Sequence, residues 1–178
     1  TATAEYLLTS CPAVTHVAIG EGEETIAEFA EFLDGRRKIE QVSGVWWRDA
    51  SGAVVKNPER ARLRLPDQLP WPAWHLFDPE PYYKIGGGFG VERGRSIPIV
   101  ATRGCPYQCT FCSNPGMWTT RYVMRDPAKV VDEIQHYIKK YKSDNIEFWD
   151  LTAIVKKDWT LAFCAEVLRR GLKFTWQL

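Results

Sequence analysis

The sequence predicts an α/β protein whose second half contains a parallel sheet. Three observations support this prediction. Apolar residues recur at helical spacing between residues 127 and 141, short β-branched or aromatic runs stand on both sides of that stretch, and turn residues separate the elements. Strand, loop and helix follow one another twice from residue 97 onward, an order typical of parallel strands joined by right-handed crossovers.

The first part of the chain is predicted to form a strand, a helix and a hairpin. Residues 14–19 form a β-branched run typical of a buried strand, and residues 20–24 break it. A helix then runs to Gly35 with an apolar stripe made of Ile26, Phe29, Ala30 and Leu33. Residues 44–48 and 53–56 flank a four-residue turn at 49–52 and predict a hairpin, which we expect at a sheet edge.

Prolines and tryptophans dominate residues 58–95, which we interpret as a linker between one domain at 1–57 and another at 96–178. Proline fixes φ and removes a backbone donor, so we expect an extended segment. Its tryptophans indicate that it packs on a surface. The glycine run at 86–90 follows no predicted strand and precedes no GK[ST] sequence, so we interpret it as a loop and not as a phosphate site.

The second half is more regular. Asp126 and Pro127 form an N-cap and a first helical position, and the apolar stripe that follows makes this helix the clearest element. The expected elements are a strand at 97–101, a helix at 127–141, a strand at 145–151, a helix at 157–170 that ends at Gly171, and a strand at 172–177.

Three cysteines at C-x3-C-x2-C spacing, Cys105, Cys109 and Cys112, follow the first of these strands. Thiolates are soft ligands that select zinc, copper(I) or iron-sulfur clusters. Three of them can hold three irons of a cubane cluster and leave the fourth iron open for substrate. A structural zinc site is the alternative, and it requires a fourth ligand from among His75, His136 and Cys164.

Polar residues also follow the other two strands of the second half. The carboxyl ends of parallel strands meet at one rim, where α/β proteins bind their ligands. We therefore expect Asp150 and Thr152, after the second strand, and Gln177, at the end of the third, to lie near the cysteine loop.

Composition narrows the class of protein further. The net charge of +1 predicts no general attraction to nucleic acid or anionic lipid. No apolar run approaches the roughly 18 residues that span a bilayer, and no signal-peptide pattern is present, so we expect a cytoplasmic protein. Five cysteines, three of them clustered, favour a reducing compartment and a metal or redox role. We interpret the chain, from Thr1 to Leu178, as a piece of a longer protein.

A resemblance to the cluster loop of radical S-adenosylmethionine enzymes is carried by the run Gly104-Cys105-Pro106-Tyr107-Gln108-Cys109-Thr110-Phe111-Cys112-Ser113. The first half is similar to the end of the cobalamin-binding domain of one subgroup, which contains anaerobic magnesium-protoporphyrin ester cyclases and class B methylases. The segments that carry this similarity are Gly20-Glu21-Gly22-Glu23-Glu24-Thr25, the hairpin, Leu69-Pro70-Trp71-Pro72-Ala73-Trp74 and Phe77-Asp78. The resemblance implies the C-terminal part of a Rossmann-like cobalamin-binding domain followed by the first units of a partial (β/α) radical SAM barrel.

The resemblance also implies an activity. A 4Fe-4S cluster on the three cysteines would reductively cleave S-adenosylmethionine to a 5'-deoxyadenosyl radical, with cobalamin as a second cofactor. The radical would start the methylation, cyclisation or other modification of an unactivated carbon in a small-molecule or peptide substrate. An external donor such as flavodoxin or ferredoxin would supply the electron. The alternatives are a radical SAM enzyme that does not use cobalamin, and a non-catalytic zinc or iron-sulfur binding module.

By the same resemblance, Phe111 borders the adenine and Asp150 contacts the methionine amino group. The subgroup often has paired acidic residues after its second strand, but here Leu151 takes the second place, so only Asp150 is carried over. A helix cap is the alternative role for Asp150. The cobalamin-ligating D-x-H-x-x-G motif is absent from the sequence, and its expected place is upstream of Thr1.

Several other polar residues have both a structural and a functional interpretation. We interpret His16 as a core histidine. Glu21 and Glu23 are interpreted as solvated turn residues, with a place at the cobalamin edge as the alternative. Three arginines flank the cysteine loop and are interpreted as surface residues, with carboxylate binding as the alternative: Arg103, Arg121 and Arg125.

Overall fold

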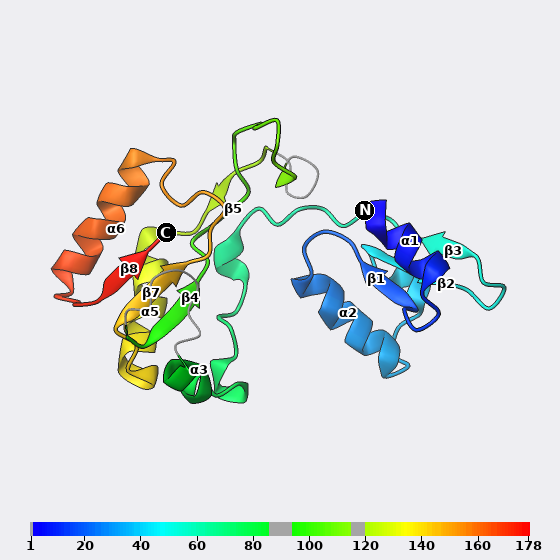
Figure 1. Cartoon of the computed structure of the whole chain (residues 1–178), viewed down its shortest axis with the longest axis horizontal. Helices are drawn as coiled ribbons and strands as arrows, with labels where there is room; N and C mark the ends of the chain where they lie inside the picture. Colours follow the sequence, from blue (N-terminus) through cyan, green and yellow to red (C-terminus); the bar gives the residue numbers. More distant parts are fainter. Residues whose placement is uncertain (1, 86–93, 115–119) are drawn as a thin grey trace. The chain divides into compact units, whose positions relative to one another are not determined.

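The computed structural model describes residues 2–85, 94–114 and 120–178 (Figure 1). The chain divides into two compact units, Thr1–Arg64 and Leu65–Leu178. The glycine run at 86–90, predicted to be a loop, lies outside the described residues. None of the helices in the described part has both the length and the apolar character needed to cross a membrane.

The first unit contains two α-helices and a small antiparallel sheet. Its elements are α1 (Ala2–Ser10), β1 (His16–Ala18), α2 (Glu23–Leu33), the 3-10 helix η1 (Ile39–Gln41), β2 (Val45–Arg48) and β3 (Val54–Lys56). The strand order is β1-β2-β3, and both pairings are antiparallel. The predicted hairpin of β2 and β3 is confirmed. Of its two strands only β3 lies at an edge of the sheet, because β1 pairs with the other side of β2. A small core gathers around Ile39, Val42 and Val45.

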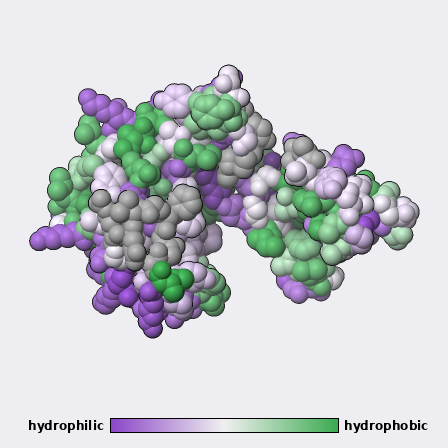
Figure 2. Space-filling view, in the orientation of Figure 1, coloured by the Kyte–Doolittle hydropathy of each residue, from purple (hydrophilic) through white to green (hydrophobic). Residues whose placement is uncertain are grey.

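Helix α2 buries a different face from the predicted one. Apolar residues remain at the surface of both units, as Figure 2 shows for one face. In α2, Ile26 is 64% exposed and Leu33 is 69% exposed, whereas Thr25 is only 2% exposed. The predicted stripe is therefore confirmed only at Phe29, which packs against the core of this unit, and is wrong at Ile26, Ala30 and Leu33.

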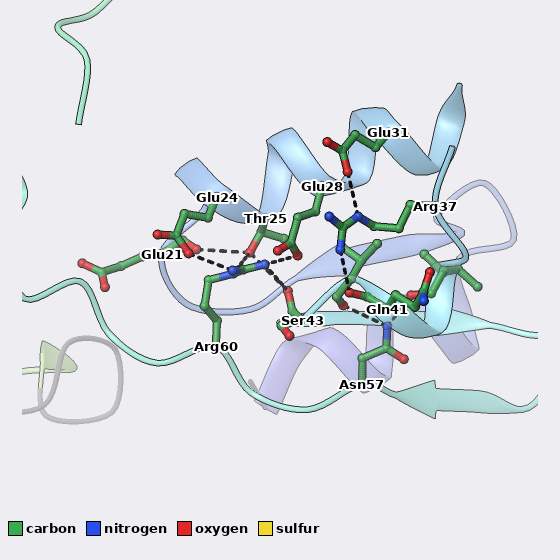
Figure 3. A network of polar contacts seen from close by, with 12 residues as sticks. Glu21, Glu24, Thr25, Glu28, Glu31, Arg37, Gln41, Ser43, Asn57 and Arg60 are labelled. Carbon is green, nitrogen blue, oxygen red and sulfur yellow. Dashed lines mark hydrogen bonds and ion pairs between the residues drawn. The ribbon is translucent and has the colours of Figure 1, made fainter. Parts of the chain in front are cut away.

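The reason is a polar network between α2 and the chain after β3 (Figure 3). The Arg60 guanidinium donates to the Thr25 hydroxyl at 2.9 Å and to the Glu24 carboxylate at 2.8 Å. It also forms an ion pair with Glu28 and donates to the Ser43 carbonyl at 3.4 Å. This network turns the Thr25 side of the helix inward.

The second unit contains a parallel sheet with helices that pack on it. Its elements are η2 (Pro66–Gln68), η3 (Trp74–Leu76), α3 (Glu80–Ile85), β4 (Ser96–Ile99), β5 (Thr102–Arg103), β6 (Val123–Met124), α5 (Pro127–Tyr141), β7 (Asn145–Phe148), α6 (Lys157–Arg169) and β8 (Thr175–Gln177). The parallel strands stand in the order β4-β7-β8, and β5 pairs with β6 antiparallel. The predicted parallel sheet is confirmed.

Helix α5 forms as its start signal predicts. The Asp126 carboxylate accepts from the backbone N–H groups of Ala128 at 2.8 Å and Lys129 at 3.2 Å, which satisfies two of the donors that a helix start leaves free. The apolar faces of the helices and of the sheet then form one core, which contains Ile97, Ile99, Ala101, Val130, Val131, Ile134, Tyr137, Ile146, Phe148 and Phe163.

The expectation of an extended segment is wrong for residues 65–85. This part of the chain contains two 3-10 helices and α3. Pro66 stands at the first position of η2, where its fixed φ favours a helical turn. The Asp67 carboxylate joins this segment to the start of α5, because it accepts from Arg125 Nε at 3.1 Å and from the Asp126 N–H at 2.6 Å. The segment is thus an integral part of the second unit.

Candidate functional site

The cysteine loop begins just after the carboxyl end of β4. The short strand β5 leads into Gly104, which has a φ of +81°. A Cβ atom at this position would lie 1.9 Å from the Arg121 carbonyl oxygen. Only glycine therefore allows the loop to pass this close to the chain that enters β6.

The three thiols of the loop are free and accessible. Cys105 is half-buried, Cys109 and Cys112 are exposed, and none forms a disulfide. The Cys112 N–H donates to the Cys109 carbonyl at 3.0 Å, which closes a turn between these two residues. The Asn114 N–H lies 3.4 Å from Cys112 Sγ. The loop thus presents soft donors, although no three His, Cys, Asp or Glu side chains converge on a metal position within the described ranges.

The end of β7 lies directly against the start of this loop. Asp150 Oδ1 accepts from the Thr102 backbone N–H and, at 2.9 Å, from the Thr102 hydroxyl. The Thr152 hydroxyl lies 3.1 Å from Cys105 Sγ. The prediction that Asp150 and Thr152 lie near the cysteine loop is confirmed. Gln177 lies one strand further along the sheet, since it pairs with Glu147 of β7.

The Asp150 carboxyl group has a raised pKa. Burial raises the pKa of Asp150 to about 6, against the opposing effect of the hydrogen bonds from Thr102. Its second oxygen, Oδ2, is buried and has no hydrogen-bond partner among the residues that the structure describes. Asp150 does not cap α6, because that helix begins at Lys157 and the carboxylate bonds Thr102 instead.

Apolar side chains surround the rim. Phe111, predicted to border an adenine, is 92% exposed between Cys109 and Cys112. Trp149 and Leu151, on either side of Asp150, are also exposed. Exposed aromatic rings offer flat surfaces against which a planar ligand can stack.

The residues considered as a fourth zinc ligand are engaged elsewhere or exposed. The His136 ring lies 5.3 Å from the Trp71 ring, and Cys164 packs against the core of the second unit. His75 is exposed in η3. In the described residues, none of the three is brought to the cysteine loop.

Arg125 is not the surface residue that we had expected. Its side chain is 11% exposed, its Nη1 lies 2.6 Å from Glu133 Oε2, and it also pairs with Asp67. The Tyr137 hydroxyl donates to the same Glu133 carboxylate. A glutamate within the buried stripe of α5 was the sequence signal that such a buried ion pair exists.

In the first unit, the structure contradicts the interpretation of Glu21 and agrees with that of His16. The Glu21 side chain is 9% exposed and accepts from the Leu63 N–H at 2.6 Å, so it is not a solvated turn residue. His16 packs edge-on against Phe29, with ring centres 5.0 Å apart, as a core histidine would. Burial lowers the pKa of His16.

Several known proteins are similar to this chain in sequence or in fold. No protein-family model matches the chain. An uncharacterized methyltransferase of Pyrococcus horikoshii is 28% identical over 99% of the chain and 37% of its own length. The anaerobic magnesium-protoporphyrin IX monomethyl ester cyclase of Rubrivivax gelatinosus is 30% identical over 96% of the chain and 30% of the cyclase. The cytidylyl-2-hydroxyethylphosphonate methyltransferase of Streptomyces wedmorensis is 29% identical, over 83% of the chain and 32% of that enzyme.

Solved structures share the fold. The cobalamin-dependent S-adenosylmethionine radical enzyme OxsB, with aqua-cobalamin and S-adenosylmethionine bound, matches 97% of the chain and 23% of its own with a TM-score of 0.70 at 22% identity. The radical S-adenosylmethionine methyltransferase TsrM of Kitasatospora setae matches 94% of the chain and 31% of its own with a TM-score of 0.66 at 21% identity.

These matches agree with the resemblance found in the sequence, because the solved structures that share the fold are cobalamin-dependent or radical S-adenosylmethionine enzymes. The homologues of the chain are methyltransferases and magnesium-protoporphyrin ester cyclases. The chain spans about a third of the length of these relatives.

Proposed function

We propose that the chain carries the cluster loop and part of the S-adenosylmethionine site of a cobalamin-type radical enzyme, which modifies an unactivated carbon of a small-molecule or peptide substrate. The observation that carries this proposal is the arrangement of the rim. A loop with three free thiols starts after one parallel strand, and a buried carboxylate stands at the end of the next, with one oxygen that has no partner among the described residues. The methyltransferases and cyclases among the homologues support the same class of reaction.

Cys105, Cys109 and Cys112 would hold a 4Fe-4S cluster. Three thiolates suit iron in a cubane cluster and leave one iron without a protein ligand. When bound, the cluster supplies the electron that cleaves S-adenosylmethionine to methionine and a 5'-deoxyadenosyl radical, while cobalamin would carry a methyl group. The exposure of Cys109 and Cys112 suits electron delivery by an external donor such as flavodoxin or ferredoxin.

Asp150 and Phe111 would orient S-adenosylmethionine. The ionised form of Asp150 is disfavoured by burial, and a cationic amino group beside its unpaired Oδ2 would relieve that cost. Phe111 would cover one face of the adenine with its exposed ring. The roles differ: Asp150 would recognise charge, and Phe111 would recognise a flat apolar surface.

For the chain as a whole, we propose that residues 1–57 end a cobalamin-binding domain, that 58–95 lead into the radical domain with residues 65–85 packed as part of it, and that 96–178 open the barrel. The similarity of the fold to OxsB and TsrM supports this assignment. We also propose a cytoplasmic location, because free exposed thiols persist in reducing compartments.

The test is an anaerobic assay of the full-length protein. After cluster reconstitution, dithionite and S-adenosylmethionine should yield 5'-deoxyadenosine, and Cys105→Ala, Cys109→Ala and Cys112→Ala should each abolish it. Cys164→Ala is the matched control, because Cys164 packs in the core of the second unit and should leave the product unchanged. Product formation that persists in any of the three loop variants would contradict the proposal.

Metal analysis separates this proposal from a binding module. We expect about four irons and four sulfides per chain after anaerobic purification. Stoichiometric zinc without iron would falsify the radical function and favour a structural zinc site. Bound cobalamin in the purified protein would distinguish the cobalamin-dependent enzyme from one that does not use it.

A further inference from the structure

The strand-end segment after β7 touches the sulfur of one proposed cluster ligand. Thr152 Oγ1 lies 3.1 Å from Cys105 Sγ, a short distance for a hydrogen bond to sulfur. A thiolate bound to a metal carries no proton and can only accept. When Cys105 holds a metal, the Thr152 hydroxyl must therefore be the donor.

The backbone of Thr152 is held in place by the Tyr122 hydroxyl and lies close to the Thr102 hydroxyl, which donates to Asp150 Oδ1. The Tyr122 hydroxyl donates to the Thr152 carbonyl at 3.1 Å and to the Ala153 carbonyl at 3.3 Å. The Thr102 hydroxyl lies 3.4 Å from the same Thr152 carbonyl. Tyr122 and Thr102 lie on the two chain segments that flank the cysteine loop, so the backbone that carries the Thr152 hydroxyl lies against the loop segments.

We propose that Thr152 is a positioning and tuning residue that donates a hydrogen bond to the Cys105 thiolate and raises the reduction potential of the cluster. This inference rests on the proposed function. Reduction adds one electron to the cluster and increases the negative charge on its sulfurs, while no bond forms or breaks in the protein. A donor to a ligand sulfur stabilises the more negative, reduced form more strongly, so it makes reduction easier.

The effect of Thr152 on the reduction potential can be tested by substitution, because its hydrogen bond comes from the side chain. Cys112 Sγ receives the backbone N–H of Asn114 at 3.4 Å, and a side-chain substitution does not remove that group. Thr152 does not cap α6, because the residue before that helix is Lys156. A purely structural role for the hydroxyl would leave the cluster potential unchanged, and the two interpretations can therefore be separated.

The experiment compares Thr152→Val, which keeps the shape and removes the hydroxyl, with Thr152→Ser, which keeps the hydroxyl. Thr160→Val is the matched control, because the Thr160 hydroxyl bonds the Lys156 carbonyl within α6. Each full-length variant is reconstituted and titrated anaerobically, and the reduced cluster is followed by electron paramagnetic resonance. We expect Thr152→Val to lower the equilibrium constant for one-electron reduction about tenfold, which corresponds to about 59 mV. Thr152→Ser and Thr160→Val should match the wild-type protein.

Each outcome supports or overturns the inference. An unchanged potential in Thr152→Val with full iron content overturns it and leaves the proposed function standing. A wild-type protein that holds zinc and no iron overturns both. If Thr152→Val binds too little iron to titrate, Tyr122→Phe takes its place, because it removes the donor that holds the Thr152 carbonyl. A lowered potential in that variant supports the inference, and an unchanged one overturns it.

Discussion

Two buried polar clusters, one in each unit, differ in how fully their hydrogen-bonding groups are used. In the first unit, Asn57 Nδ2 donates to the carbonyls of Ile39 at 2.6 Å and Val42 at 2.9 Å, and Asn57 Oδ1 accepts from Trp47 Nε1 at 3.2 Å. In the second unit, Asp150 satisfies one oxygen through Thr102 and leaves the other buried without a partner in the described part of the chain.

The difference is the one expected between a structural cluster and the ligand site proposed above. A buried polar group whose partners are all present holds the fold together, whereas one that is half satisfied costs stability. A protein retains such a cost where a ligand completes the network. The two clusters therefore predict different responses to substitution. The expected effects run from a large loss of bound iron at the cysteine loop to a small change in the pH dependence of stability at Thr102.

The largest effect is expected for Gly104→Ala. The new Cβ would meet the Arg121 carbonyl at 1.9 Å and would also require a φ of +81°, so the loop must move. Overpacking of about 1–3 kcal/mol adds to about 1–2 kcal/mol of left-handed strain, and we expect most of the bound iron to be lost. Gly171→Ala, at a φ of +62° with no atom within 4 Å of its Cβ, is the control and should retain its iron. Equal iron content in the two variants would count against the close approach.

The next effect is expected in the other cluster, for Asn57→Ala. The substitution leaves two carbonyls and an indole N–H without their partner, so we expect a loss of about 2–3 kcal/mol in the stability of the first unit. Hydrogen exchange of residues 39–57 measures this loss locally. Glu40→Ala, at an exposed position beside the cluster, should change exchange little. Iron content should stay normal in both variants, and a loss of iron in Asn57→Ala would show that the clusters are not independent.

Local signals in the sequence were sufficient for the helices α5 and α6 and the three parallel strands of the second unit. The Asp126 cap, the stripe of α5 and the Gly171 stop all concern neighbouring residues, and the structure contains these elements. The position of Asp150 beside the cysteine loop could also be predicted, because the carboxyl ends of parallel strands in one sheet lie at the same rim.

What the sequence could not predict depends on residues far apart in the chain. Arg60 selects the buried face of α2 from 35 positions away, against the apolar stripe through Ile26. The rule for parallel strand ends placed Thr152 near the cysteine loop, but it could not predict that the Thr152 hydroxyl lies 3.1 Å from Cys105 Sγ, 47 positions away. The prolines between residues 65 and 85 were compatible with extended chain and with short helical turns, and the contacts of Asp67 with α5 decide between them.

A smaller effect of opposite sign is expected for Asp150→Asn. Burial raises the pKa of Asp150 from 3.8 to about 6, so between these values the native state binds the proton more tightly than the unfolded state. The stabilising effect is complete below about pH 4 and is lost as the pH rises through about 6. The amide removes the buried charge, so the apo variant should be more stable than wild type by about 1–2 kcal/mol at pH 7.5.

Unfolding by urea at pH 5 and pH 7.5 measures this effect on the apo protein. The stability gained by Asp150→Asn should be larger at pH 7.5, and an equal gain at both values would argue against an ionised, buried Asp150. In the reconstituted protein, we expect the same variant to bind S-adenosylmethionine about tenfold more weakly, since a charge-assisted hydrogen bond contributes about 1.5–3 kcal/mol. A variant that gains stability and keeps full affinity would exclude Asp150 from the ligand site.

The smallest effect is expected for Thr102→Val, which removes one of the two donors to Asp150 Oδ1 and keeps the backbone N–H. Loss of a donor to the ionised carboxylate raises the pKa of Asp150 further, and we expect a shift of less than about one unit, or about 1 kcal/mol. The fall in apo stability with pH should then be centred at a higher pH than in wild type. In the double variant with Asp150→Asn, this pH dependence should vanish, because the group that titrates is gone. If Thr102→Val moved the transition equally in both backgrounds, the hydroxyl would act on the fold and not on Asp150.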